Sequence, residues 1–415
     1  MSEALGPQPW IADPATTAVM DALEAAGGPG CARFVGGAVR NAVLGGPVED
    51  IDIATTLEPP AVIAALQAAG LKAVPTGVEH GTVTAVSARR PYEITTLRRD
   101  VETDGRRAVV AFTQDWGQDA ARRDFTLNAL YADRRGVILD PGGTGLADAR
   151  AGRIVFVGDP ATRIAEDYLR ILRFFRFFAW YGRGTADAAA LSACAAMSDG
   201  LAGLSAERIS KELLKLLAAD DPRASVRLMD EAGVLRALVP QAQGLARFEA
   251  LVEIQADQFF PSDPLLRLAA LLGEDADRGV TLAATLRLSN DQRARLTASL
   301  GREPRIASWM GAREIRRAIY AIGARALADR AMLAWAGAGA TSASHQWRAL
   351  LALAASWTPP PFPVTGDDAI LAGAPKGPKV GEALKEVELW WIDNDFTDDR
   401  AAAVERLKAV VQGMS

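Results

Sequence analysis

The sequence has little cysteine and little histidine, and both shortages restrict its chemistry. Its 415 residues include two cysteines, Cys31 and Cys194, which stand far apart and outside any C-x-x-C pair. A disulfide framework and a cysteine-bound zinc cluster are therefore not encoded, and we expect no disulfide partner. The two histidines, His80 and His345, are too few for a histidine-rich metal centre and leave no spare partner for a Ser-His-Asp arrangement.

Long apolar runs are missing as well. No stretch approaches the roughly 18 uninterrupted apolar residues of a membrane span, and the first residues, MSEALGPQPW, lack the basic and apolar regions of a secretory signal. We therefore expect a cytoplasmic protein with no membrane partner. Because 49% of the residues are hydrophobic and 23% are charged, the chain can bury a large core and should form two or more domains.

Positive charge is in the minority, since the net charge is −5, but it is concentrated in two places. Residues 163–183 hold five arginines against two acids, and residues 89–107 hold six arginines against four acids. Local positive charge is what phosphate binding requires, so nucleic acid is not excluded. Arginine also far outnumbers lysine, which suits bidentate contacts to phosphates and bases but is equally consistent with a compositional bias of the genome.

The hydrophobic pattern changes its period along the chain. Short β-like runs alternate with helical ones from residue 31 to about 157, and beyond that point only helical periodicity remains. The fold class is therefore predicted as α+β, with an N-terminal head built on a small mixed β-sheet and helices, followed by an all-α neck, body and tail. Continuous helices are expected at 118–132 and 163–183, and linkers at 141–152 and 357–368. The predicted domains are 1–157, 158–222, 223–356 and 357–415.

Acidic residues recur with a strand-like period in EDIDIAT, residues 49–55. Side chains i and i+2 leave the same face of a strand, so Asp50 and Asp52 should project together while Glu49 points to the other side. Two parallel carboxylates repel each other unless a cation lies between them, which favours Mg²⁺ held by one or two carboxylates and by substrate phosphates. Glu93, on another predicted strand, is a candidate third acid. A surface turn for D-x-D, and an exposed strand position for Glu93, remain alternatives.

The segment ARFVGGAVRNAVLG, residues 32–45, predicts a strand, a tight turn at Gly36 and Gly37, and then a helix. The backbone N–H groups and the positive dipole end at the start of such a helix suit phosphate oxygens. Arg40, one turn into the helix, is placed to reach the same phosphates. Taken alone, a diglycine is more often a plain turn.

Charged residues also recur at i+3 steps along the predicted helix 163–183, each step turning about 60° around the axis. They are Asp167, Arg170, Arg173 and Arg176. Apolar side chains surround them, so the helix should be largely buried and its charges need partners. Pairing of Asp167 with Arg170 is the plain structural interpretation.

The functional interpretation of this pair follows from hydrogen-bond chemistry. A carboxylate only accepts and a guanidinium only donates, so Asp167 beside Arg170 offers an acceptor next to a donor. Cytosine and adenine present an amino donor beside a ring-nitrogen acceptor, whereas uracil and guanine present a carbonyl beside an N–H. The pair is therefore predicted to accept C and A and to reject U and G.

Five motifs, in this order, resemble those of the class II CCA-adding enzymes, within the bacterial tRNA nucleotidyltransferase and poly(A) polymerase family. The resemblance covers roughly residues 31–215. GGAVRN with EDIDIAT resembles the motif that binds metal and triphosphate, and RRDFTLNAL resembles the ribose motif. LDPGGTGLADARAG resembles the hinge motif. EDYLRILRFFRF resembles the protein-template motif, and SAERISKEL resembles the helix motif that follows it. It implies a nucleotidyltransferase head at 1–157, a base-recognising neck at 158–222, and a tRNA-binding tail at 357–415.

The resemblance also implies roles for individual residues. Asp50 and Asp52 would bind the metal, and Gly36, Gly37 and Arg40 would bind the triphosphate. Arg123, Asp124 and Asn128 would contact ribose and phosphate. Asp167 and Arg170 would read the base, and Arg173 and Arg176 would support nucleotide binding. Glu93 is a third ligand or a base. Asn41 stands where the family usually has Asp, which puts a local helix contact in doubt rather than the chemistry. Lys376 and Lys379 lie in a tail motif where a tRNA phosphate would bind, although an ordinary helix entry explains them equally well.

The expected function is addition of C, C and A to the 3′ end of tRNA from CTP and ATP, without a nucleic-acid template and with Mg²⁺ as cofactor. The alternatives are a poly(A) polymerase, a partial CC- or A-adding enzyme and, less favoured, a non-catalytic RNA-binding protein. The stretch VSARRPYEITTLRR lacks the basic aromatic sequence of poly(A) polymerases, which favours tRNA. A flexible loop at 98–112, which CC-adding enzymes lack in part, favours full CCA addition.

Overall fold

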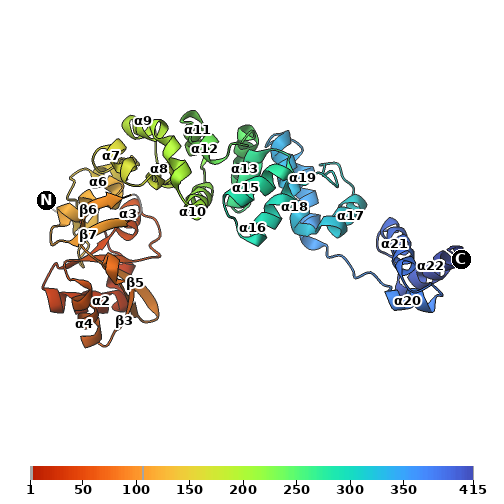
Figure 1. The fold of residues 1–415 in the computed structure, drawn as a ribbon, viewed down its shortest axis with the longest axis horizontal. Coiled ribbons are helices and arrows are strands. Elements are labelled where there is room, and N and C mark those ends of the chain that lie inside the picture. The colour runs from red at the N-terminus through yellow and green to blue at the C-terminus, as the bar shows by residue number, and fades with distance from the viewer. Residues whose placement is uncertain (1–2, 105–106, 415) are drawn as a thin grey trace. The chain divides into compact units, whose positions relative to one another are not determined.

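The computed structural model describes residues 3–104 and 107–414 of the chain. The chain divides into two compact units, Met1–Pro240 and Gln241–Ser415. The first unit combines a β-sheet with helices and the second is helical (Figure 1), which confirms the α+β class. The division into four domains stays a prediction. In the part of the chain that the structure describes, no helix is long and apolar enough to cross a membrane.

A seven-stranded mixed sheet organises the first unit. Its strand order is β3-β4-β5-β2-β1-β8-β9, in which β2 and β5 run parallel and the other neighbours are antiparallel. The strands are β1 (Ala32–Val35), β2 (Asp52–Thr55), β3 (Lys72–Gly77), β4 (Thr82–Ser87), β5 (Arg90–Thr96), β8 (Tyr131–Ala132) and β9 (Ile138–Leu139). Helices α2 (Pro14–Gly27) and α4 (Pro59–Ala68) pack against the sheet (Figure 1). Central β2 is buried at Ile53, Ala54 and Thr55, whereas β4 alternates buried and half-buried residues, as period-2 patterning predicts.

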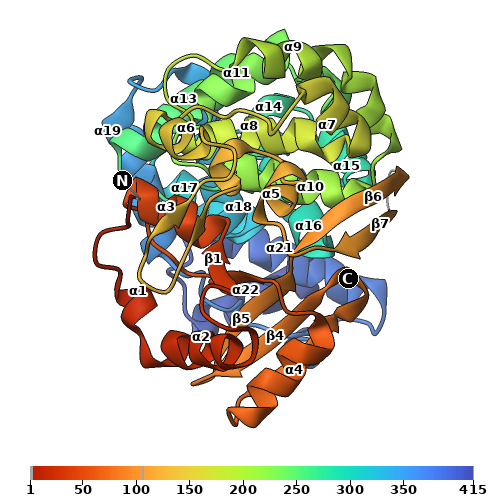
Figure 2. The same ribbon diagram turned by 90° about the vertical axis from the view of Figure 1, so that its left-hand side faces the viewer.

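The predicted loop at 98–112 is a two-stranded antiparallel ribbon of β6 (Arg98–Asp104) and β7 (Arg107–Phe112). The ribbon lies beside α5 (Trp116–Ala121), as Figure 2 shows. Gly105 and Arg106, which also belong to the predicted loop, lie outside the described residues.

The predicted continuous helix at 118–132 is wrong. Helix α5 ends at Ala121, and a 3₁₀ helix η2 (Thr126–Asn128) and strand β8 follow. Two contacts account for the break. The carboxylate of Asp124 accepts the backbone N–H of Phe125 (2.9 Å), which competes with helical bonding, and Tyr131 pairs with Val35 in the sheet.

The predicted continuous helix at 163–183 is also wrong. Helix α7 (Pro160–Glu166) ends before Asp167, whose backbone is extended (φ −156°, ψ 105°), and α8 (Leu169–Tyr181) begins two residues later. The Asp167 carboxylate accepts the backbone N–H of Leu169 (3.1 Å). Asp167 therefore lies between the two helices, and its carboxylate binds the first N–H of α8.

The first unit contains further helices. They are α1 (Pro9–Ala12), α3 (Gly37–Leu44), η1 (Val78–His80), α6 (Gly145–Ala151), α9 (Ala188–Ala196), η3 (Ser198–Gly203), α10 (Ala206–Leu217), α11 (Arg223–Glu231) and α12 (Val234–Leu238). Helix α8 packs against α10 and α11. The ring of Phe125 contacts the rings of Phe156 and Phe177, so an aromatic core joins α8 to the segment that follows α5.

The second unit consists of helices. They are α13 (Leu245–Asp257), α14 (Pro264–Leu272), α15 (Ala276–Thr285), α16 (Asn290–Ser299), α17 (Ala312–Ile322), α18 (Ala324–Ala338), α19 (Ser344–Ser356), α20 (Gly366–Leu371), α21 (Pro378–Asp393) and α22 (Arg400–Gly413). The connections between α16 and α17 and between α19 and α20 are longer than the others. The last three helices share a small apolar core that includes Ala369, Val387 and Leu407.

Gly145 permits the close packing of α6 on η2, the element that carries Asn128. A Cβ atom at residue 145 would lie 2.4 Å from the backbone oxygen of Thr126. We expect Gly145→Ala to lower the free energy of unfolding of the first unit by about 1–3 kcal/mol in denaturant titrations. Gly142→Ala is the matched control, because a Cβ there meets only Asp140 at 3.9 Å. Equal unfolding midpoints for the two variants would contradict this account.

Candidate active site

Acidic side chains meet on the central strands of the sheet, where β1 ends and β2 begins, and we call this place the edge. Antiparallel pairing places Asp52, the first residue of β2, opposite Val35, the last residue of β1, and parallel pairing places Asp52 opposite Glu93 of β5. Asp50 is exposed and precedes β2 instead of belonging to it, which corrects the predicted strand start. The structure therefore brings Asp50, Asp52 and Glu93 together, while Glu49 is exposed.

The electrostatics of this edge are unfavourable for one more negative charge. Burial, then the charge of Glu93, then that of Asp50 raise the pKa of Asp52 to about 6, and the charge of Arg123 opposes them. A cation beside these carboxylates would relieve the repulsion. Over residues 3–104 and 107–414, no group of three or more His, Cys, Asp and Glu side chains is arranged to hold a metal. A cation here would therefore need oxygens of a bound substrate besides the carboxylates.

The diglycine turn joins β1 to α3 at the same edge. Gly36 has φ 64° and ψ −122°, a left-handed conformation that favours glycine, and Gly37 opens α3. The first N–H groups of a helix have no acceptor within it, so they are available to an anion. A Cβ on Gly36 would lie 3.9 Å from Nη1 of Arg123, and one on Gly37 would lie 3.8 Å from Nη2 of Arg40. Two guanidinium groups therefore lie beside the turn.

Buried Arg40 is held by three side chains. It donates to Oδ1 of Asn128 (2.7 Å), to the hydroxyl of Tyr181 (2.8 Å) and to Oδ1 of Asn41 (2.9 Å from Nη2). Burial lowers the pKa of Arg40 from its usual value. Asn41 also donates from Nδ2 to the backbone oxygen of Pro47 (2.9 Å), a bond that an ionised aspartate could not make. Asn41, the residue that departs from the family pattern, therefore contacts both Arg40 and the segment that follows α3.

Arg123 is positioned by a buried acid that the sequence analysis missed. Its Nη2 donates to Oδ2 of Asp119 (2.9 Å), and the same oxygen accepts the hydroxyl of Tyr131 (2.7 Å). The other carboxylate oxygen of Asp119 accepts Nε of Arg122 (2.8 Å). Burial alone would raise the pKa of Asp119, but the charges of Arg123 and Arg122 outweigh it and hold that pKa at about 2.

The predicted ribose residues Asp124 and Asn128 connect the head to α8. Asp124 accepts Nδ2 of Asn128 (3.0 Å) and Nε of Arg173 (2.8 Å). Asp124 is buried, which would raise its pKa, but the charge of Arg173 and these hydrogen bonds lower it. Because Asn128 also accepts from Arg40, hydrogen bonds run without a gap from α3 to α8.

The predicted pair of Asp167 and Arg170 is not formed in this structure. Asp167 accepts Nη2 of Arg208 on α10 (2.7 Å), and Arg170 forms an ion pair with Glu166. The break between α7 and α8 is the reason, because Asp167 no longer stands one helical turn before Arg170.

Arg176, the last of the four charged residues predicted at i+3 steps, follows Arg173 by three residues on α8. Its Nε is 2.7 Å from a carboxylate oxygen of Glu212 on α10, and its guanidinium lies 4.4 Å from the centre of the Phe177 ring. Burial is the main reason that the pKa of Arg176 is lowered.

Sequence reasoning missed five residues that contact the predicted site. They are Asp119, Glu166, Tyr181, Arg208 and Glu212. Asp119 did carry a signal, because it stands four residues before Arg123 at the spacing of a helical ion pair. Arg208 and Glu212 lie in the quoted motif SAERISKEL, but nothing in that motif indicates their partners on α8.

The comparisons with known proteins agree with this geometry. A family model described as the poly A polymerase head domain matches residues 32–155, and one described as a probable RNA- and SrmB-binding site of polymerase A matches residues 186–245. The chain is 33% identical over 389 residues to CCA tRNA nucleotidyltransferase 1, mitochondrial, of Mus musculus, covering 91% of this chain and 86% of that protein. The chain belongs to the CCA tRNA nucleotidyltransferase family.

Two further members of the CCA tRNA nucleotidyltransferase family extend the comparison. The Homo sapiens protein of the same name is 33% identical over 384 residues, covering 91% of this chain and 86% of that protein. The crystal structure of the Bacillus stearothermophilus CCA-adding enzyme in complex with CTP has a TM-score of 0.77 and 26% identity, covering 98% of this chain and all of that chain. Nucleotidyltransferases of this kind generally use divalent metal ions.

Asp119 should stabilise the fold in a pH-dependent way. Its pKa is about 2 in the folded chain instead of 3.8, so its ionised form contributes roughly 2 kcal/mol to folding above pH 4. We expect Asp119→Asn to lower the free energy of unfolding by about that amount at pH 7, and the difference from wild type to shrink as pH falls from 4 to 2. Denaturant titrations of both proteins at each pH measure this difference. A difference that persists unchanged at pH 2 would argue against the ion pairs as its cause.

Proposed function

We propose that this protein adds C, C and A to the 3′ end of tRNA, using CTP and ATP and no nucleic-acid template. The observation that carries the proposal is the meeting of Asp52 and Glu93 with the turn at Gly36 and Gly37, in a member of the CCA tRNA nucleotidyltransferase family. Acids and a phosphate-binding helix start at one sheet edge are what nucleotidyl transfer requires.

The reaction forms one phosphodiester bond and breaks one phosphoanhydride bond. The 3′-hydroxyl oxygen of tRNA attacks the α-phosphorus of CTP or ATP, and pyrophosphate leaves. In our proposal the turn at Gly36, the N–H of Gly37 and the guanidinium groups of Arg40 and Arg123 bind the triphosphate. These groups lie beside the turn and carry the positive charge that a triphosphate needs.

We assign Mg²⁺ as the cation and Asp50 and Asp52 as its ligands, with Glu93 as a third ligand or a base. The raised pKa of Asp52 supports this, because its carboxylate lies where a positive charge is favoured. Bound Mg²⁺ would lower the pKa of the tRNA 3′-hydroxyl and stabilise the charge on pyrophosphate.

The proposed base reader is the pair of Asp167 and Arg170 at the junction of α7 and α8. Asp167 would accept the amino group of C or A, and Arg170 would donate to the neighbouring ring nitrogen. Arg173 and Arg176 would support nucleotide binding, and Asp124 and Asn128 would contact the ribose. Arg208 and Glu166, the present partners of the reading pair, would then exchange for the base.

The predicted domains fit this assignment. The head (1–157) would carry the chemistry, the neck (158–222) the base reader, and the body (223–356) and tail (357–415) the tRNA contacts, with Lys376 and Lys379 in the tail. A cytoplasmic location is part of the proposal.

The decisive experiment offers tRNA transcripts that lack CCA, or end in CC, together with labelled CTP or ATP and Mg²⁺. We expect the wild-type protein to complete CCA on both. Asp52→Ala should reduce incorporation on the order of 10³-fold or more while tRNA binding stays nearly intact. Glu49→Ala, which removes an exposed neighbouring charge, is the matched control and should stay active.

The other outcomes separate the alternatives. Absence of incorporation by wild type would refute the enzyme, long A tails on unrelated RNA would favour a poly(A) polymerase, and a stop after CC would favour a CC-adding enzyme. Equal loss of tRNA binding in Asp52→Ala would count against a metal role.

Asp167→Ala should impair the choice of nucleotide more than the chemistry. Loss of one acceptor to the base amino group should reduce discrimination of CTP against UTP by about 10- to 100-fold. The measurement is the ratio of kcat/KM for CTP and UTP on tRNA lacking CCA. Asp199→Ala, an exposed acid on η3, is the control. An unchanged ratio in Asp167→Ala would refute the base-reading role.

A further inference from the structure

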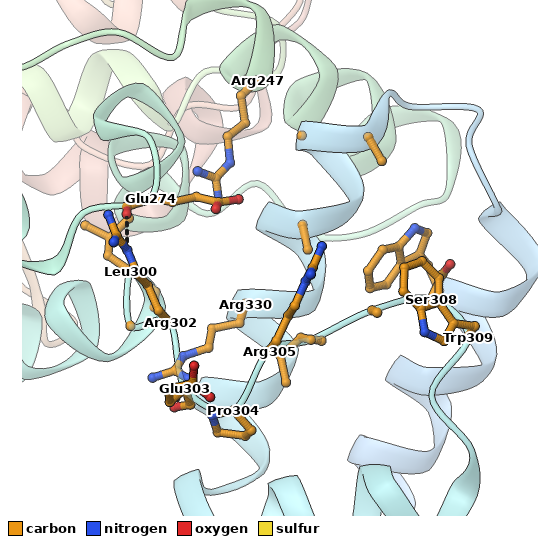
Figure 3. A pocket seen from close by; sticks show the side chains of 18 of the residues that line it. Arg247, Glu274, Leu300, Arg302, Glu303, Pro304, Arg305, Ser308, Trp309 and Arg330 are labelled. Atoms are coloured by element: carbon orange, nitrogen blue, oxygen red, sulfur yellow. Dashed lines mark hydrogen bonds between the residues drawn. The ribbon is translucent and has the colours of Figure 1, made fainter.

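The second unit contains a basic hollow that the catalytic proposal does not use. It has a volume of about 530 Å³ and is lined by α13, by α18 and by the segment from Ser299 to Trp309 between α16 and α17. We call it the body pocket. Figure 3 shows that Arg247, Arg302, Arg305 and Arg330 surround it, from these different elements of the unit.

The charge of the body pocket is opposite to that of the whole chain. Four arginines line it, and only two acids, Glu274 and Glu303, do so. The pocket therefore has a net charge of +2, in a chain whose net charge is −5. Local positive charge on an acidic protein is what binding of a polyanion requires.

Backbone oxygens, not carboxylates, orient three of these arginines. The acceptors are all backbone carbonyl oxygens. Nε of Arg247 donates to that of Leu333 (3.0 Å), and Nε of Arg302 donates to that of Glu274 (3.1 Å). Arg330 donates from Nε to that of Ala298 (2.7 Å) and from Nη1 to that of Glu303 (2.6 Å). Among the described residues, none of the four lining arginines has a carboxylate within ion-pair distance. Arg295 and Arg316 of the same unit do form such pairs.

The consequence is positive charge that is fixed in place but not neutralised. A carbonyl oxygen directs a guanidinium and leaves its charge uncompensated, so further donors can bind an anion. Burial lowers the pKa of Arg247, and the nearby charge of Glu274 offsets this only in part. An anion in the pocket would stabilise the charged form.

Two neighbours shape the body pocket for a ligand larger than a single ion. A Cβ at Gly301 would lie 2.1 Å from Nη2 of Arg330, so glycine leaves space for that guanidinium. Trp309, at the end of the lining segment, is 77% exposed and offers an apolar face beside the arginines. Arginine forks bind phosphate, and an exposed aromatic face lets a base of the same nucleic acid stack beside it.

We propose that the body pocket binds a phosphodiester group of the RNA substrate. The proposal rests on the proposed function for the presence of tRNA, and it adds a specific binding site in the body. Free phosphate or a nucleotide offers the same phosphate chemistry, so the experiment separates these sources.

The test measures binding of labelled tRNA that lacks CCA over a range of salt concentrations. Arg305→Ala is the main variant, because Arg305 is exposed and forms no hydrogen bond or ion pair in the described part of the chain, so the fold should tolerate its loss. We expect tRNA affinity to fall by about threefold to tenfold and the slope of log K against log salt to decrease by about 1. Arg330→Ala should give a similar loss, with its folding checked by thermal unfolding.

Arg325→Ala is the matched control, since Arg325 is exposed on the same helix as Arg330 but does not line the pocket. It should keep the wild-type salt slope. If Arg305→Ala and Arg325→Ala bind tRNA equally well, the proposal is overturned. It is also overturned if millimolar inorganic phosphate or ATP raises the Tm of wild type but not of Arg305→Ala, while both bind tRNA alike.

The same protein samples distinguish this proposal from the proposed function. Incorporation of CTP by wild type tests the function, and the salt slope of Arg305→Ala tests the pocket. At saturating tRNA we expect Arg305→Ala to keep the wild-type KM for CTP, because the loss lies in tRNA binding. A raised KM for CTP with unchanged tRNA affinity would overturn the pocket assignment and leave the proposed function intact.

Discussion

The ion pair between Asp124 and Arg173 is the contact on which the geometry of the candidate site depends. Asp124 is buried, and its carboxylate holds the backbone of Phe125 and the amide of Asn128 as well as Arg173. Asn128 in turn holds Arg40 beside the diglycine turn. An ion pair that is only partly exposed contributes to structure when further hydrogen bonds satisfy its partners, and here those bonds also fix where two elements meet. One carboxylate thus couples the phosphate-binding side of the head to the helix proposed to support nucleotide binding.

At the edge of the sheet, the arginines have fixed hydrogen-bond partners, whereas Asp52 lies near like charges. Arg123 and Arg40 are fixed by Asp119, Asn128 and Tyr181. Asp52 instead lies near the charges of Glu93 and Asp50, which the charge of Arg123 only partly offsets. The acids therefore stay electrostatically unsatisfied, while the arginines are fully oriented. A triphosphate with a divalent cation would complement both sides at once, since phosphate oxygens would meet the guanidinium groups and the cation would meet the carboxylates. This asymmetry is why the edge suits nucleotidyl transfer better than a purely structural role.

Short-range patterns predicted the parts of the site that depend on local geometry. Period-2 alternation placed Asp52 and Glu93 on strands, and the structure pairs them across β2 and β5. The diglycine predicted the turn before α3. The helix breaks at residues 122–125 and at Asp167 were missed because the competing contacts are local hydrogen bonds of Asp124 and Asp167, which apolar periodicity does not register. The β6–β7 ribbon was expected as a flexible loop because the family resemblance implied one there; β6 (RRDVETD) is mostly polar, and only β7 (RAVVAF) is mostly apolar. Arg208 and Glu166 were missed because a partner far along the chain, or on the far side of a helix break, leaves no fixed spacing.

The break at Asp167 also changes the meaning of the proposed base reader. In a continuous helix Asp167 and Arg170 would stand one turn apart and could neutralise each other, and their donor and acceptor would be consumed. The break instead commits Asp167 to Arg208 and Arg170 to Glu166, so each reading group has its own counter-charge. In the proposed reading mode, a base bound between them would replace one hydrogen bond on each side, and Arg208 and Glu166 would be released from Asp167 and Arg170. A base with the reversed pattern places acceptor against carboxylate and donor against guanidinium, and both native pairs are lost without replacement. Discrimination then comes from the penalty on the wrong base as much as from affinity for the right one.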